Sequence, residues 1–452
     1  MSVRGGRGLA LGATLALATS GVEAQRAPPG PAQPSPGCLL EIVHADSGVT
    51  IPGPGGTVNY FARGDVQLRC RGQEVSMRSD SVAATAGRIF EFIGRVRYRD
   101  STIEMDADRG TYFRDGERWE ARGRVFTRNL RTGSTLRGPS LDYYRAIPGQ
   151  RDTAMLYAVG RPRIEYVTTD SAGRRGEPYV IHGDRVRMRG EDRLWAGGKV
   201  TIDRSDFAAR GDSLRLDAGP AGDGSLLGGL PTLRGLGPDS FRLEGRRIDF
   251  RLDRRELTYL VAKGQGHAVN ASWDLRADTI ALDIEGGALV QTLAWGDSLR
   301  PHADSPEHEI RADSLALDTP GRRLREARAF GAAWVGTAPD SATGERDWLS
   351  GDTVVAQFAQ RDSAGTTRSV LRRIEARHEA RSFYRVSDPR RPGPPSLNYS
   401  RGDRIVVTMK PGDDRAVERV DLYGRVDGVQ LEPVRGESVP APPEDRATGG
   451  RR

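Results

Sequence analysis

Lysine is nearly absent from this sequence, and hydrophobic and aromatic residues are scarce. These scarcities limit the fold classes that the chain can adopt. Three lysines, Lys199, Lys263 and Lys410, leave almost all of the 68 basic side chains as arginine. Hydrophobic residues make up 37% and aromatic residues 6% of the 452 residues, which is lean for one large globular core. No stretch has a useful helical period, and no segment beyond the N-terminus approaches the roughly 20 apolar residues that span a bilayer. A helical bundle and a helical membrane protein are therefore not expected.

Charge of one sign does not accumulate anywhere along the chain. The 61 acidic residues are interleaved with the arginines, and the net charge is +7. A nucleic-acid-binding surface gathers its cations in one patch, so the pattern predicts no nucleic-acid partner. It is typical of solvent-facing strands with a mild attraction to anionic surfaces.

Cysteine occurs only at Cys38 and Cys70. An oxidising compartment would allow the two to form a disulfide, but the sequence leaves that pairing open. A lipid anchor on Cys38 is disfavoured, because Ser35 stands three positions earlier and a Pro-rich tract separates this cysteine from the apolar N-terminal stretch.

The first 24 residues have the pattern of a secretory signal peptide. Arg4 and Arg7 form a basic start, an apolar stretch follows over 9–19, and Val22-Glu23-Ala24 offers small residues for cleavage near Ala24. We therefore expect an exported, periplasmic protein, and we leave association with the outer membrane open.

A small residue followed by Asp recurs along the chain and defines about ten units. The clear copies and two degenerate ones are Ser79-Asp80, Ala107-Asp108, Gly138-Pro139, Gly183-Asp184, Gly211-Asp212, Gly245-Arg246, Ala277-Asp278, Ala312-Asp313, Gly351-Asp352 and Gly402-Asp403. Positions three before, two after and four after the Asp slot are apolar in every unit, except at Gly110 and Ser400. This set of inward positions predicts paired strands, one pair for each unit.

The spacing of two on each side of the motif is strand periodicity, but its parity changes across the Asp. An uninterrupted strand cannot keep both apolar sets on one face, so the chain must bulge or bend at this point. Asp suits such a corner because its side chain caps nearby backbone N–H groups, which makes these carboxylates structural. Strands that end on glycine, such as those before Gly94 and Gly123, predict a further bend or a close backbone approach.

These patterns predict an all-β chain with the following domains. We expect a signal peptide at 1–24, a Pro-rich linker at 25–38, a first β-repeat array at 39–217, a Gly/Pro-rich insertion or hinge at 218–239, a second array at 240–432 and an aperiodic tail at 433–452.

The repeat resembles the OstA-like family of lipopolysaccharide-transport proteins, which includes LptA, LptC and the periplasmic domain of LptD. The best match is the stretch 94–144, where G-x-V, T-I-E-M-D-A-D-x-x-x-Y and W-E-A-x-G-x-V follow in that order. The likeness extends as a pattern over about 40–430, and the chain has about twice the usual number of strands.

The resemblance implies an elongated, twisted, open β-jellyroll or β-solenoid whose two strand layers form a trough for lipid acyl chains. It implies a non-enzymatic bridge for lipopolysaccharide or a similar glycolipid, without a cofactor, stacking edge to edge with other β-jellyroll proteins of this transport system. Arg95, Arg97, Arg122, Arg124 and Arg163 are candidates for a rim that contacts lipid head groups. The expected trough-facing residues are Val96, Tyr98, Ile103, Met105, Tyr112, Val125, Ile181, Val186, Met188, Leu214 and Leu216.

The sequence also allows two other functions. One is a structural or adhesion module of the cell envelope with a closed, dry core, and another is a secreted enzyme acting on glycans. The cluster His302-x-Asp304-x-x-Glu307-His308 lacks the spacing of a helical metal site, and Asp106-x-Asp108 lacks the glutamate that a calcium loop requires, so no metal is expected.

Overall fold

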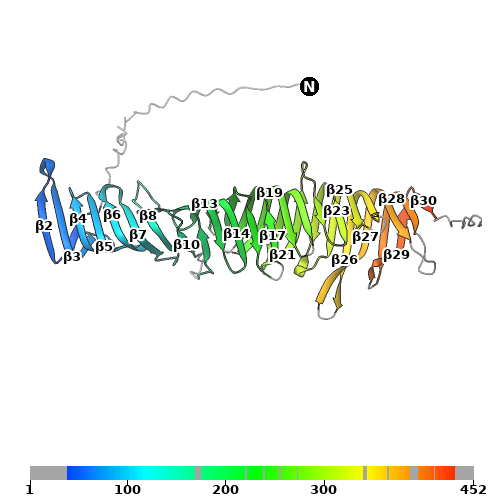
Figure 1. Cartoon of the computed structure of the whole chain (residues 1–452), viewed down its shortest axis with the longest axis horizontal. Coiled ribbons are helices and arrows are strands. Elements are labelled where there is room, and N and C mark those ends of the chain that lie inside the picture. Colours follow the sequence, from blue (N-terminus) through cyan, green and yellow to red (C-terminus); the bar gives the residue numbers. More distant parts are fainter. Residues whose placement is uncertain are drawn as a thin grey trace, which may run out of the picture. The chain divides into compact units, whose positions relative to one another are not determined.

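A computed structural model describes residues 38–167, 175–218, 221–237, 240–253, 256–271, 273–339, 344–363, 366–386, 395–411 and 413–432. Strands dominate these residues, and every pairing among them is antiparallel and joins strands that are near neighbours along the chain (Figure 1). The all-β prediction is therefore confirmed. The predicted signal peptide and the tail lie outside the described residues, and within them no helix is long and apolar enough to cross a membrane.

Long strands follow one another as hairpins through most of the ladder. These strands are Val58–Cys70 (β3), Ser76–Thr85 (β4), Ile89–Arg99 (β5), Ile103–Phe113 (β6), Arg118–Asn129 (β7), Thr135–Tyr144 (β8), Arg193–Asp203 (β13), Phe207–Asp217 (β14), Glu256–Asn270 (β19), Asp274–Glu285 (β20), Glu326–Thr337 (β25), Trp348–Ser363 (β26), Thr366–Val386 (β27) and Ser396–Lys410 (β28).

Elsewhere two successive strands, separated at a corner, take the place of one long strand. These are Leu40–His44 (β1) with Ser47–Pro52 (β2), Met155–Val159 (β9) with Arg163–Tyr166 (β10), Tyr179–His182 (β11) with Arg185–Arg189 (β12), Ala221–Leu227 (β15) with Thr232–Gly235 (β16), Phe241–Glu244 (β17) with Arg247–Asp253 (β18), Ala288–Trp295 (β21) with His302–Asp304 (β22), His308–Arg311 (β23) with Ser314–Asp318 (β24), and Asp413–Tyr423 (β29) with Asp427–Leu431 (β30). Short 3-10 turns occur at Pro54–Gly56, Arg114–Gly116 and Pro320–Arg322.

The strands bend at the predicted Asp corners. The register shifts between Arg78 and Ser81 in β4 and between Asp106 and Arg109 in β6, and β11 and β12 separate at Gly183-Asp184. The predicted parity change is therefore confirmed. Ala45-Asp46 adds a further corner, between β1 and β2, whose flanking positions are too polar for the pattern to have marked it.

Most Asp corners face the glycine of the strand that follows, whereas at Asp352 the positive φ values fall on His378 and Glu379. A Cβ atom on Gly94 would collide with the Asp80 carboxylate, and one on Gly123 would collide with Asp108. Gly94 and Arg95 both have positive φ values, 76° and 44°, which produces the bend opposite the Asp. The glycines that end the predicted strands are thus the partners of the Asp residues, which the sequence analysis had treated separately.

At each corner the chain crosses from one of two strand layers to the other. We call the layer that contains β1, β10, β11, β16, β17, β22, β23 and β30 layer A, and the layer that contains β2, β9, β12, β15, β18, β21, β24 and β29 layer B. The long strands contribute one half to each layer. The layers join at the Asp corners, and their hairpin turns form two free edges on the other side.

The predicted insertion or hinge at 218–239 is wrong. Residues 221–227 and 232–235 form β15 and β16, which pair with β14 on one side and with β18 and β17 on the other. The segment 228–231 between these two strands lies at the Asp212 corner. The Gly/Pro-rich composition therefore marks an ordinary corner, and the ladder continues through it. Of the predicted linker at 25–38, only Cys38 lies among the described residues, and it is fully buried.

Candidate functional site

The predicted trough-facing residues all point between the two layers, but most are deeply covered. Met188 is half-buried, whereas the others are buried by neighbouring side chains: Val96, Tyr98, Ile103, Met105, Tyr112, Val125, Ile181, Val186, Leu214 and Leu216. They contribute to one continuous hydrophobic core, with Met188 packed against it. These side chains point inward, as the sequence predicts. Most of them lie close to the Asp corners, where neighbouring side chains pack against them.

Aromatic side chains fill the interior between β5 and β8. Trp119 is 1% exposed, and its ring centroid lies 5.1 Å from those of both Phe92 and Tyr98 and 6.2 Å from that of Tyr112. Gly110 provides the space for this indole, since a Cβ there would collide with it. This explains why the apolar pattern breaks at Gly110, and it shows that no open trough exists at this depth.

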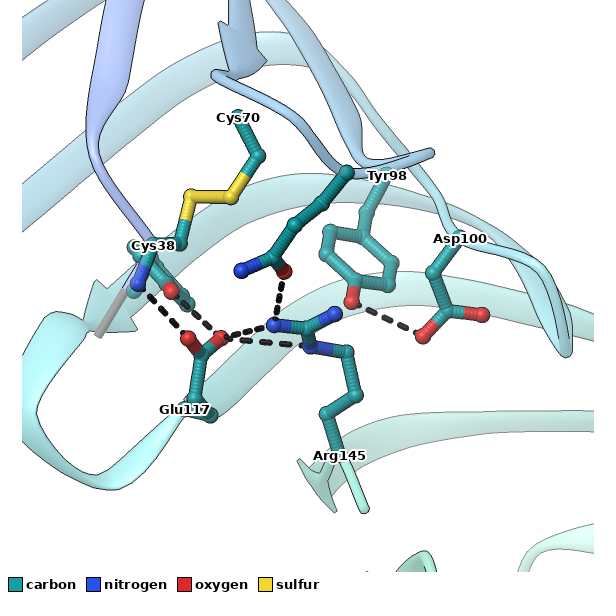
Figure 2. The surroundings of a disulfide bond; sticks show 8 residues. Cys38, Cys70, Tyr98, Asp100, Glu117 and Arg145 are labelled. Carbon is teal, nitrogen blue, oxygen red and sulfur yellow. Dashed lines mark hydrogen bonds and ion pairs between the residues drawn. A yellow bond between two sulfur atoms is a disulfide. The ribbon is translucent and has the colours of Figure 1, made fainter. Parts of the chain in front are cut away.

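The free edges of the two layers are joined at the N-terminal end by a group that we call the clasp: Cys38, Cys70, Gln73, Glu117 and Arg145 (Figure 2). The two cysteines form a disulfide, which the sequence had left open. The Cys38 backbone N–H donates to Glu117 Oε1 at 2.7 Å, and Arg145 Nη2 lies 2.9 Å from Glu117 Oε2. Arg145 also donates to Gln73 in the β3–β4 turn. Layer A and layer B are thus connected across their open side.

Two tyrosines extend this connection inward. The hydroxyl groups of Tyr98 and Tyr143, from different layers, each donate to Asp100 Oδ2 at 2.9 Å, and the Tyr98–Asp100 bond is drawn in Figure 2. The other carboxylate oxygen accepts the backbone N–H groups of Thr102 and Ile103. Burial raises the pKa of Tyr98 well above its usual value, so its hydroxyl remains a donor.

Beyond the clasp, three apolar hollows follow one another along the free edges. The first, about 270 Å³, lies between β6 and β12, and Ile103, Leu156 and Met188 line it. The second, about 300 Å³, lies between β14 and β21, with Phe241, Leu257 and Leu289 in its walls.

The third hollow is the largest of these, about 460 Å³, and lies between β23 and β29. Leu371, Val407 and Val420 form part of its apolar wall, while Glu307, His308 and Asp347 stand at its polar end. Both layers contribute to its walls: Val335 and Leu349 lie in layer A, and Ile374 and Val407 lie in layer B.

The residues that line the hollows lie farther from the Asp corners than most predicted residues. Only Ile103 and Met188 of the predicted set take part. Leu156, Leu257, Leu289, Leu371 and Val420 were missed, and all are half-buried apolar residues packed on the core, as is Val407, which the repeat pattern marks as inward four residues after Asp403. Extending the strand alternation from each corner toward the hairpin turns would have identified these positions as inward-facing. It would not have shown which of them remain uncovered.

The candidate rim arginines lie on the outer strand faces and form ion pairs with carboxylates. Arg95 and Arg124 pair with the corner residues Asp80 and Asp108, and the others pair as Arg97–Asp106, Arg122–Asp142 and Arg163–Glu165. Arg124 lowers the pKa of Asp108 by donating side-chain and backbone hydrogen bonds to it. These arginines stabilise the outer faces and do not converge on the hollows.

The histidine cluster separates in the structure. His302 and Asp304 approach Glu309, with His302 Nε2 lying 2.9 Å from Glu309 Oε1, whereas Glu307 and His308 line the third hollow. Arg311 and Arg346 also contact Glu309. Two guanidinium groups already neutralise this carboxylate, which disfavours a metal ion beside it.

Comparisons with protein-family models and with curated proteins found no match for this chain.

Proposed function

We propose that this chain is a non-enzymatic, periplasmic lipid-binding bridge for lipopolysaccharide or a similar glycolipid, and that it holds acyl chains along the free edges of its two layers. The observation that carries the proposal is the succession of three apolar hollows between those edges. Association with similar β-jellyroll proteins at the strand edges is part of the same proposal, since β2 and β30 expose Val49, Ile51, Val429 and Leu431.

The chemistry of the hollows supports acyl chains as the ligand. Half-buried apolar side chains such as Leu156, Leu257 and Val420 lie in their walls, and each methylene transferred onto such a surface contributes about 0.8 kcal/mol. An acyl chain lying along the free edges would leave the lipid head group at the protein surface, near polar residues such as Glu307, His308 and Asp347 of the third hollow.

A structural or adhesion module with a dry core is the second candidate. The clasp and the packing around Trp119 favour it for the first strands, because they leave no space between the layers there. The two candidates differ in whether the hollows bind lipid.

Photo-crosslinking distinguishes these candidates. A benzophenone side chain placed at Leu156, Leu257 or Val420 is expected to label lipopolysaccharide, because each of these positions faces a hollow. Glu91, exposed on the outer face of β5, is the matched control and is expected to remain unlabelled. Absence of labelling at all three hollow positions, or equal labelling at Glu91, would support the dry module instead.

A further inference from the structure

A second kind of hollow lies on the outer face of layer B, between β9 and β15. Its volume is about 570 Å³, and Arg185, Arg187, Arg215, Tyr157 and Trp195 are among the residues that line it. Because strand side chains alternate, these residues point away from the buried Val186, Leu194 and Leu214, and thus away from the three interior hollows.

The strand register places the three arginines around one glycine. Arg185 pairs with Gly197, which pairs with Ser213 on the next strand, and Arg187 and Arg215 flank Trp195 in the neighbouring row. Adjacent strands are about 4.8 Å apart, so three long guanidinium side chains can meet above Gly197. The glycine has no side chain to occupy that space, and the Arg185 guanidinium lies beside it.

Arg187 is held in place by aromatic rings. Its guanidinium carbon lies 4.8 Å from the Trp195 ring centroid and 5.7 Å from that of Tyr157. Such contacts orient a guanidinium group and leave its N–H edges free for an anion.

Among the described residues, Arg185, Arg187 and Arg215 form no ion pair, in contrast to outer-face pairs such as Arg122–Asp142 at 2.7 Å. The nearest carboxylates along the chain have other partners: Asp184 pairs with Arg161 at 3.3 Å, and Asp217, two residues after Arg215, pairs with Arg193 at 3.5 Å. The hollow therefore gathers three guanidinium groups whose positive charge no ion pair among the described residues neutralises.

We propose that this outer hollow binds an anionic polysaccharide, with one carboxylate or phosphate group above Gly197 between the three arginines. Guanidinium groups bind such oxyanions bidentately, and the edges of Tyr157 and Trp195 offer apolar contact to a sugar ring. A nucleic acid fits less well, because its charge density is higher and it prefers free aromatic faces, whereas these rings face Arg187. The site is on the outer face and does not depend on lipid binding in the interior.

The test is a titration of the full chain with polygalacturonate, with dextran as the neutral polymer. Polygalacturonate is expected to bind and dextran is not. Arg187→Gln and Arg215→Gln are each expected to weaken binding by about tenfold or more, since each removes a charge-assisted hydrogen bond. Arg251→Gln is the matched control, because Arg251 also lies over a tyrosine ring, at 5.0 Å from Tyr259, but outside the hollow.

Three results would overturn this proposal: unchanged affinity in both hollow variants, equal binding of dextran, or tighter binding of an oligothymidylate. Urea unfolding of each variant verifies folding, and little change is expected because Arg185, Arg187 and Arg215 are exposed. Lipid photo-crosslinking at Val420 is expected to be the same in Arg187→Gln as in the parent chain, so failure of this proposal is distinguishable from failure of the lipid proposal.

Discussion

At the scale of single residues, Glu117 shows how one buried carboxylate can join two layers. It is 5% exposed and accepts hydrogen bonds from the Cys38 backbone, the Tyr112 hydroxyl and the Arg145 guanidinium. No repeat position marks Glu117 in the sequence, because its role depends on partners that are 79 and 28 residues away. A buried acceptor shared by distant donors is a tertiary feature.

Removing this carboxylate is expected to destabilise the chain. Glu117→Ala leaves the Arg145 charge, the Tyr112 hydroxyl and the Cys38 N–H without their acceptor, which we expect to cost about 3 kcal/mol in urea unfolding. Asp115→Asn is the control, because the Asp115 pair with Arg88 is largely exposed, and a change below about 1 kcal/mol is expected. Equal effects of the two substitutions would contradict the role assigned to Glu117.

At the scale of strands, the corner is a two-residue device in which an Asp on one strand faces a glycine on the next. The sequence shows both residue types and predicts the bend, because the parity change requires it. It does not pair them, since sequence spacing between Asp80 and Gly94 says nothing about which atoms touch.

Gly94→Ala tests the corner. The added methyl group would meet the Asp80 carboxylate and would require a positive φ of 76°, so a loss of about 1–3 kcal/mol in unfolding free energy is expected. Gly237→Ala is the control, because nothing lies within 4 Å of the added atom. If both substitutions left the urea midpoint unchanged, the Asp–Gly contact would not be the constraint that we describe.

At the scale of the whole molecule, ion pairs within and between strands recur along the ladder and make its stability depend on pH. Arg377 and Arg373 lower the pKa of Glu375 below its ordinary 4.5, and Arg124 lowers that of Asp108 below its ordinary 3.8. A carboxyl group whose pKa is lower in the folded state stabilises that state above its ordinary pKa, and this contribution is lost as the pH falls through the lowered value.

We therefore expect the urea midpoint to be level between pH 7 and pH 5 and to fall below about pH 4. Arg377→Gln is expected to make the fall less steep, because it removes the first cause of the lowered Glu375 pKa. A midpoint that does not change down to pH 3 would mean that these pairs contribute nothing measurable to folding.

The sequence by itself determined the all-β fold, the ten predicted corners and the inward orientation of Val96, Met105, Leu214 and the other trough candidates. Each of these follows from local alternation, which a chain must obey when one strand face is buried. The same local reasoning failed at 218–239, where glycine and proline were taken for a hinge although they only form a corner beside regular strands.

Only the tertiary structure decided which inward positions stay open. Trp119 fills the space between the layers in the N-terminal strands, whereas a hollow remains between β23 and β29, and this difference depends on side chains that both layers contribute. The pairing of Cys38 with Cys70, the clasp at Glu117 and the arginines around Gly197 also depend on residues brought together across the ladder. Because alternation specifies a side chain's direction and not its neighbours, these sites became visible only in the folded chain.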